Sequence, residues 1–143
     1  MTLILTPQLK PYADRWFTAI PHRRSRRRYT AQRLLTTELA SRMQHVCEDF
    51  RPFPCVRAVF IERAPETLFW GIIGGYGKIK GATSAIIFIG NSTDISYREA
   101  VGYSGEGIIL EATSPRPFRL AISDIRLMKS SSAFIFNYIL REL

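Results

Sequence analysis

The sequence has little of what metal centres, disulfide scaffolds and membrane segments require. Its 143 residues include only two cysteines and two histidines, too few for a structural zinc site or a disulfide framework. Cys47 and Cys55 are therefore expected to be free thiols in a reducing compartment. The longest wholly apolar run, residues 85–89, is far shorter than the about 20 residues of a membrane-spanning helix. The apolar start before Pro7 is too short for a signal peptide, so we expect a cytoplasmic protein with no membrane partner.

Acidic residues are also scarce, and the resulting charge is unevenly placed. The chain has 20 Lys and Arg against 12 Asp and Glu, a formal net charge of +8. Residues 1–28 contain seven basic residues and one acidic residue, residues 29–115 contain eight and nine, and residues 116–143 contain five and two. Five of the six residues 23–28 are arginine. The basic character therefore belongs mainly to one short segment.

The hydrophobic pattern predicts one α+β domain, or a piece of one. Apolar residues make up 46% of the chain and charged residues 22%, close to globular averages. The spacing predicts helices over residues 8–20, 36–50 and 96–113, strands over residues 55–61 and 83–90, and a glycine-rich loop over residues 71–81. The order helix, helix, strand, strand, helix indicates a mixed or antiparallel sheet.

The first two helices have recognisable buried faces. Tyr12, Trp16 and Ile20 follow one another at intervals of four residues, which places them on one face of the first helix. Thr36 is expected to cap the second helix. Its apolar positions recur at helical spacing; they are Leu35, Leu39, Met43, Val46 and Phe50.

The second strand and the third helix carry more specific signals. The β-branched and aromatic run over residues 83–90 suits a strand covered on both faces. Ser96 and Glu99 have the spacing of a capping box at the start of the third helix. That helix contains Gly102, Gly105 and Gly107, each of which costs about 1 kcal/mol relative to alanine. Three such residues predict a close helix contact, either in the core or at a subunit interface.

The arginine-rich segment over residues 23–28, called the arginine run below, has three interpretations that follow from its chemistry. It is a nucleic-acid or nuclear-targeting patch, a pocket for one specific anion, or a solvated edge with no partner. A nucleic-acid-binding module would spread basic residues over a whole face, whereas the central part of this chain has a net charge of −1. The nucleic-acid interpretation is therefore the least favoured of the three.

Three segments together resemble the FMN-dependent nitroreductase superfamily, over about residues 9–114. Residues 20–29, Ile-Pro-His-Arg-Arg-Ser-Arg-Arg-Arg-Tyr, are similar to the opening motif of that family. Residues 77–82 with the following apolar strand resemble its glycine-then-strand unit. Residues 102–106 and 108–113 are similar to its central helix. The resemblance implies a nitroreductase-like α/β sandwich, here incomplete, with residues 1–114 as the nitroreductase-like part.

The resemblance also implies a cofactor, a reaction and a partner. Arg23, Ser25 and Arg27 would contact the FMN phosphate and ribityl chain, with Arg24 nearby. Hydride would pass from NAD(P)H through FMN to a nitroaromatic or quinone-type acceptor, and no side chain need act as a general base. The helix from Ser96 to Thr113 would form the core of a homodimer. The alternative is a catalytically inactive or truncated flavin-binding protein. A basic nucleic-acid-binding module is a third and less favoured interpretation.

Two segments depart from the family pattern. Residues 50–55, Phe-Arg-Pro-Phe-Pro-Cys, replace the polar segment that meets the flavin ring in many members, so the ring contacts cannot be assigned. After Thr113 the glycine-rich turn of the family is absent, and residues 130–140 suit either a helix or a strand. Residues 115–143 are therefore interpreted as a divergent tail.

We hypothesise that this tail arose by truncation or a frameshift in a longer reductase. The three reading frames of the encoding DNA test the hypothesis. A family-like continuation after Thr113 in another frame is the expected result, and its absence from every frame would refute the hypothesis.

Overall fold

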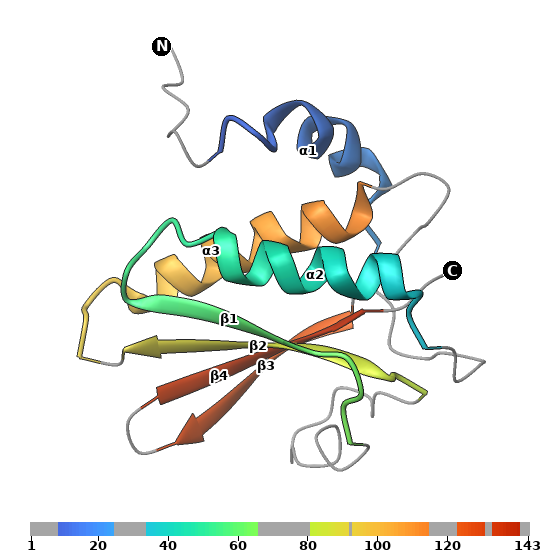
Figure 1. Ribbon diagram of the computed structural model, residues 1–143. Helices are drawn as coiled ribbons and strands as arrows, with labels where there is room; N and C mark the ends of the chain where they lie inside the picture. Colours follow the sequence, from blue (N-terminus) through green and yellow to red (C-terminus); the bar gives the residue numbers. More distant parts are fainter. Residues whose placement is uncertain are drawn as a thin grey trace.

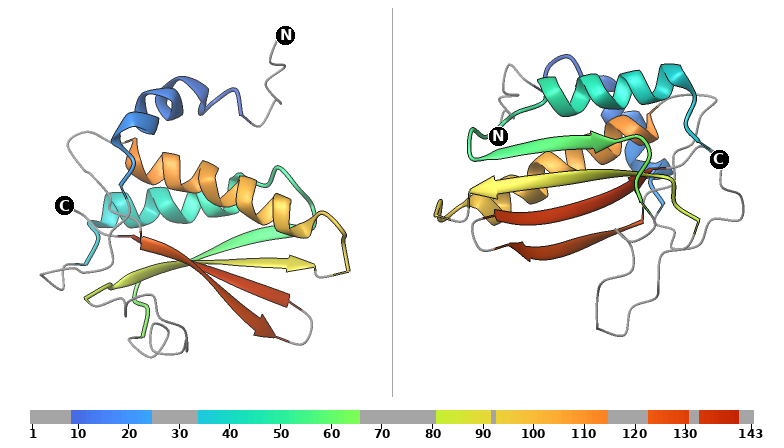
Figure 2. Two further views of the ribbon diagram at one scale, coloured as in Figure 1. Left: turned by 180° about the vertical axis from the view of Figure 1, so that it is seen from behind. Right: turned by 60° about the horizontal axis from the view of Figure 1, so that its bottom comes forward.

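The computed structural model describes residues 9–24, 34–65, 81–91 and 93–114, and the backbone of two strands at residues 123–130 and 133–140. The elements, in chain order, are α1 Ala13–Ala19, the 3-10 helix η1 Ile20–His22, α2 Thr37–Asp49, β1 Val56–Ile61, β2 Ser84–Asn91, α3 Tyr97–Thr113, β3 Ser123–Ser130 and β4 Ala133–Leu140. Helices α2 and α3 cover one face of the sheet, and α1 lies against α3 on the side away from the sheet (Figures 1 and 2). The predicted α+β class is confirmed.

The sheet has four strands in the order β1-β2-β4-β3, and every pair is antiparallel. Strand β2 is central: it pairs with β1 from Val56↔Gly90 to Ile61↔Ala85. On its other edge it pairs with β4 over its whole length. Both predicted strands are confirmed, and the sheet is the antiparallel one of the two alternatives. Residues 133–140, for which helix and strand were both open, form a strand in the same sheet.

Burial along β2 is most complete for the side chains on the face that the helices cover. The Ile86 and Phe88 side chains, which face the helices, have no exposed surface, whereas Ile87 and Ile89 on the opposite face are half-buried. Successive side chains of a strand point to opposite faces. The isoleucine and phenylalanine side chains of both faces are thus buried or half-buried, as expected for a covered strand, and those toward the helices are the more completely buried.

The first two helices follow the sequence pattern to different extents. Thr36 caps α2 through its Oγ1, which accepts a 3.4 Å hydrogen bond from the Leu39 amide, and the five predicted apolar positions are all buried. The first helix is shorter than predicted because α1 begins at Ala13 and tightens into η1 around Pro21. The Ile20 side chain lies in that 3-10 turn and is 53% exposed, so it does not share the buried face of Trp16.

The predicted capping box at the start of α3 is wrong, although the helix itself is confirmed and ends at Thr113 as expected. The Ser96 hydroxyl donates to Asp94 Oδ1 at 2.8 Å, and the Ser96 amide donates to the same oxygen at 2.9 Å. The side chain of Ser96 therefore makes no cap hydrogen bond to the first turn of α3. The aspartate two residues earlier holds the turn that leads into the helix.

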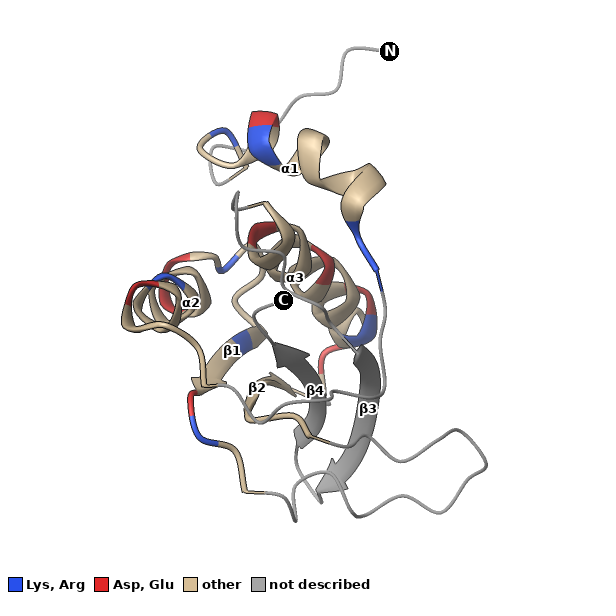
Figure 3. Cartoon of the chain, turned by 90° about the vertical axis from the view of Figure 1, so that its right-hand side faces the viewer, with Lys and Arg blue, Asp and Glu red and all other residues tan. Residues whose placement is uncertain are grey.

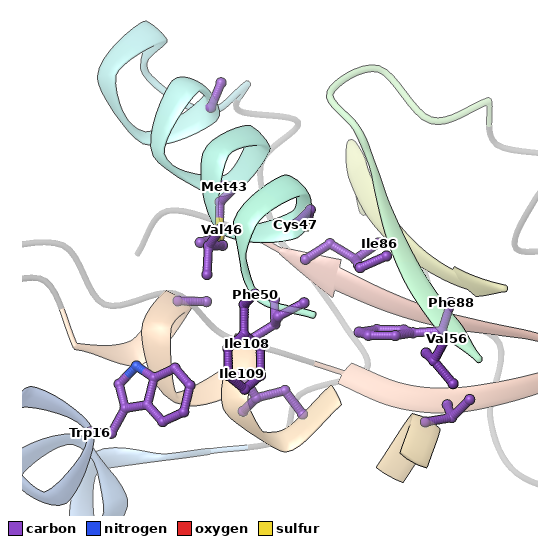
Figure 4. Packing of buried hydrophobic residues seen from close by; sticks show 14 of the residues in the cluster. Trp16, Met43, Val46, Cys47, Phe50, Val56, Ile86, Phe88, Ile108 and Ile109 are labelled. Atoms are coloured by element: carbon purple, nitrogen blue, oxygen red, sulfur yellow. The ribbon is translucent and has the colours of Figure 1, made fainter. Parts of the chain in front are cut away.

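An aromatic cluster fills the space between α1, α2 and α3, and it explains Gly107. The Trp16 ring packs edge-on against Phe50 with centroids 5.1 Å apart, next to the apolar side chains of α3 (Figure 4). A Cβ atom on Gly107 would lie 2.6 Å from Phe50 Cε1 and 2.8 Å from Trp16 Cη2. Gly107 thus permits a close approach inside the core. Gly102, by contrast, is exposed and has no atom within 4 Å of such a Cβ.

Substituting these two glycines should have opposite effects on stability. Gly102→Ala should raise the free energy of unfolding by about 0.5–1 kcal/mol, because alanine favours the helix and meets no neighbour. Gly107→Ala should lower it by about 1–2 kcal/mol, because the added methyl group displaces two packed rings and overpacking outweighs the gain in helix propensity. Urea denaturation of the two variants measures both effects. Equal stabilisation by both substitutions would contradict the close approach of Gly107 to the rings of Trp16 and Phe50.

Candidate functional site

The start of the arginine run lies at the end of η1, against α3. Arg23 is the first residue after the 3-10 turn, where its amide donates to the Ile20 carbonyl at 3.3 Å and its backbone becomes extended. This conformation brings the Arg23 Nε to 3.0 Å from Glu106 Oε1 on α3. Figure 3 shows the basic segment after α1 passing alongside α3, which bears acidic residues. The positive charge is therefore held next to a carboxylate.

The contact between Arg23 and Glu106 is an ion pair without hydrogen-bond geometry at Nε. The Arg23 Nε is buried and, within the described part of the chain, has no hydrogen-bond acceptor, even though the carboxylate oxygen is only 3.0 Å away. A buried N–H donor without an acceptor costs free energy. An anion placed in line with this N–H would relieve that cost.

Arg24 is placed differently from Arg23. It is exposed, and its Nη1 donates to the carbonyl oxygens of Pro21 at 3.0 Å and of Arg23 at 2.8 Å. Its guanidinium is thus folded back onto the η1 turn. Ser25 and Arg27, the other two predicted flavin contacts, lie outside the described residues. The structure therefore places two of the four predicted site residues next to each other.

A second charged cluster, which was not predicted, joins the three helices around Glu111. The carboxylate of this α3 residue is 97% buried and accepts five hydrogen bonds. Arg15 and Trp16 of α1 donate at 2.7–3.1 Å. Arg42 of α2 donates at 2.7 and 3.0 Å. One sequence signal could have revealed it, since Glu111 interrupts an apolar helix face, and a buried acid there needs basic partners.

The hydrogen bonds decide the ionisation of Glu111. Burial alone raises the pKa of this carboxyl, but the hydrogen bonds from Arg15, Trp16 and Arg42 and the charge of Arg42 outweigh burial, so its pKa lies below the ordinary value of 4.5. Glu111 is therefore ionised at neutral pH. Every hydrogen-bonding partner of its carboxylate is a donor, which leaves no group to exchange a proton with it. This arrangement fits a structural tie between helices and gives no support to acid–base catalysis.

The remaining reactive groups do not form a second centre with Arg23. Both cysteines are free, and burial raises the pKa of the Cys47 thiol to about 12. Among the described residues, no group of three His, Cys, Asp or Glu side chains is placed to hold a metal ion. A groove of about 320 Å³ between α2 and β1 is lined by Ser41, Gln44 and Glu62 among others, and it does not include Arg23 or Arg24.

Comparison with known proteins adds no family to this description. No protein-family model matches the sequence, and no curated protein matches it significantly. No helix in the described ranges is both long enough and apolar enough to cross a membrane. The site must therefore be interpreted from its own geometry.

Removing the Glu111 carboxylate should destabilise the fold far more than removing that of Glu106. Breaking a buried charge pair typically costs about 3–5 kcal/mol. Because Arg15 and Arg42 keep 43% and 36% of their side chains exposed, we expect Glu111→Gln to lower the free energy of unfolding by about 2–3 kcal/mol. Glu106→Gln, on the same helix, should cost less than about 1 kcal/mol, because the Glu106 side chain is 49% exposed and an exposed ion pair contributes little. Urea denaturation compares the two variants.

The pH dependence of unfolding is a second test of the role of Glu111, and it compares Glu111→Gln with the wild-type protein. Because folding lowers the pKa of Glu111, its contribution is present at pH values above the ordinary 4.5 and is lost as the pH falls through the lower folded-state pKa. The wild-type protein should therefore lose stability in acid more steeply than Glu111→Gln. Parallel acid profiles for the two proteins would contradict the role assigned to Glu111.

Proposed function

We propose that the protein is an FMN-dependent oxidoreductase of the nitroreductase type, with the arginine run beginning at Arg23 as its phosphate-binding segment. The observation that supports this is the position of the Arg23 side chain, which is 38% exposed where η1 ends against α3. Arginine donates readily to phosphate oxygens, and such charge-assisted bonds are among the stronger ones in proteins. The α+β architecture is compatible with the nitroreductase-like sandwich that forms part of the proposal.

In this proposal the protein binds and orients the cofactor. FMN, when bound, supplies the hydride chemistry between NAD(P)H and a nitroaromatic or quinone-type acceptor. Arg23 would donate to the phosphate from a backbone position fixed by η1, and Arg24, Ser25 and Arg27 would supply further donors. The ion pair with Glu106 would fix the direction of the Arg23 side chain.

The same ion pair also sets a limit on phosphate affinity. The Glu106 carboxylate offsets part of the Arg23 charge and would repel a phosphate dianion placed nearby. A single arginine in this position is therefore a weak phosphate site, and the proposal requires the further arginines of the run. It predicts that Glu106 lowers flavin affinity even though it orders Arg23.

The proposal also includes a flavin ring and a second subunit. In the segment that replaces the family's ring-binding residues, Phe50 is buried in the core, and Phe53 packs edge-on against Tyr103 at 5.4 Å. Neither side chain offers a hydrogen-bond donor to a flavin ring. The homodimer through α3 and the cytoplasmic location remain part of the proposal, and the exposed Gly102 and Tyr103 mark the part of α3 that a second copy would approach.

Loss of the arginines should release flavin from the purified protein. Arg23→Ala combined with Arg27→Ala should lower FMN affinity by about 10–100-fold, the value of one or two charge-assisted hydrogen bonds. Glu106→Gln should raise the affinity a few-fold by removing the competing carboxylate. Flavin fluorescence during titration with FMN measures both, and Arg63→Ala, an exposed arginine at the end of β1, is the matched control.

Four outcomes distinguish the proposal from its alternatives. Bleaching of the bound flavin by NADH or NADPH supports the reductase, and bound flavin that neither cofactor reduces supports an inactive flavin-binding protein. Unchanged FMN affinity in the double variant would refute the phosphate site. Colourless protein with strongly salt-dependent binding to DNA or RNA would favour the nucleic-acid module.

A further inference from the structure

A second groove lies where β1 begins and β2 ends. It has a volume of about 330 Å³ and is lined by Arg51, Pro54, Cys55, Arg57, Ile89 and Asn91, together with the backbone between them. The two strands are tied at this end by the Asn91 amide, which donates to the Cys55 carbonyl at 2.9 Å. Arg57 stands opposite Ile89 in the strand register.

Two of the side chains that line the groove, Arg57 and Ile89, lie on the face of the sheet away from the helices. Arg57 alternates with Val56 and Ala58, which are buried against the helices, so its side chain points to the opposite face. Its register partner Ile89 lies on that same face and is half-buried. The lining of the groove therefore combines apolar side chains with basic ones.

The two arginines of the groove have unpaired charges. Within the described ranges, neither Arg51 nor Arg57 forms an ion pair or a side-chain hydrogen bond, whereas Arg15, Arg23 and Arg42 each contact a glutamate. None of the residues that line the groove is acidic. An open site with two unpaired guanidinium groups attracts anions.

The other polar groups near the groove include an amide and a carboxylate, both of which accept hydrogen bonds from neighbouring residues. Asn91 Oδ1 accepts hydrogen bonds from the amide and hydroxyl of Thr93, at 3.1 and 2.7 Å. Its amide oxygen is thus engaged, which leaves the NH₂ group as the end free to bind a ligand. The carboxylate of Asp94 is not part of the groove lining, but it accepts from the Ser96 amide and hydroxyl and also interacts with the thiol of Cys55, which lines the groove.

We propose that this groove binds a small phosphomonoester, with Arg51 and Arg57 on the phosphate and the apolar part of the ligand against Ile89 and Pro54. A phosphomonoester carries a charge of about −1.5 to −2 at neutral pH, which matches two unpaired arginines. Guanidinium groups bind phosphate oxygens through paired N–H donors. The groove volume is at the lower end of the range for small-molecule sites, so a ligand of one ring with one phosphate fits better than a dinucleotide.

This inference does not rest on the proposed flavin site. The flavin proposal depends on Arg23 and Glu106, neither of which lines the groove. Arg51 and Arg57 contact no other charged side chain of the described chain, so replacing them should leave the fold and the Arg23 site unchanged. Failure of one proposal can therefore be told apart from failure of the other.

The experiment titrates the full-length protein with phenyl phosphate and follows its backbone amide signals by NMR at constant ionic strength. Saturable shifts confined to residues 51–57 and 89–91 are the expected result. Arg51→Gln and Arg57→Gln should each weaken binding about tenfold, the value of one lost charge-assisted contact. Arg63→Gln is the matched control, because Arg63 is exposed and has no ion pair among the described residues, and it should leave binding unchanged.

Several results would overturn the inference. Equal loss of binding in Arg63→Gln and Arg57→Gln would mean that phosphate responds only to overall charge. Shifts that do not saturate, or that centre on Arg23, would place the ligand elsewhere. Inorganic phosphate provides a further comparison: it should bind more weakly than phenyl phosphate, and equal affinity would show that Ile89 and Pro54 contribute nothing. Thermal unfolding midpoints equal to wild type confirm that the variants are folded.

Discussion

The buried carboxylate of Glu111 is the interaction on which the arrangement of the helices depends. It is the point where α1, α2 and α3 meet through hydrogen bonds, since Arg15 and Trp16 reach it from one side and Arg42 from the other. A buried charge is tolerated only when it is paired and hydrogen-bonded, so the three helices are held in one relative position. Apolar packing alone would allow more than one arrangement.

The core around this carboxylate is aromatic and closely packed. Trp16 donates to Glu111 through its ring nitrogen at 2.7 Å. The same ring makes a T-shaped contact with Phe50. Gly107 lies beneath both rings, where a side chain would collide. Trp16 thus takes part both in the hydrogen bonding of Glu111 and in the aromatic packing, so a change in one contact affects the other. These contacts fix the position of α1, and they therefore also fix Arg23 in the candidate phosphate site, because Arg23 follows α1 after only one 3-10 turn.

The sequence pattern predicted the elements well and the tertiary contacts poorly. The spacing from Leu35 to Phe50 predicted α2 and its buried face, because a helix against a core needs a periodic apolar stripe. The capping box failed because Asp94, two residues before Ser96, competes for its hydroxyl. Local spacing cannot show which of two nearby oxygens a side chain selects.

In the candidate sites, too, the sequence indicated individual residues but not their tertiary contacts. Arg23 and Arg24 were identifiable as candidates from their charge, but their different surroundings depend on Glu106 and on the path of η1. Glu111 was not predicted, because its partners lie 69–96 residues away in the sequence. The groove at Arg51 and Arg57 was missed as well, because it forms only when the start of one strand is paired with the end of another.

The long separation between Arg15 and Glu111 has a consequence for synthesis on the ribosome. A contact between residues 96 positions apart cannot form until α3 has left the exit tunnel, although α1 leaves it well before. Until then α1 has no carboxylate to bind and exposes Trp16, and Arg23 is not yet placed against Glu106. The position of Arg23 is therefore fixed only after a much later part of the chain has been synthesised.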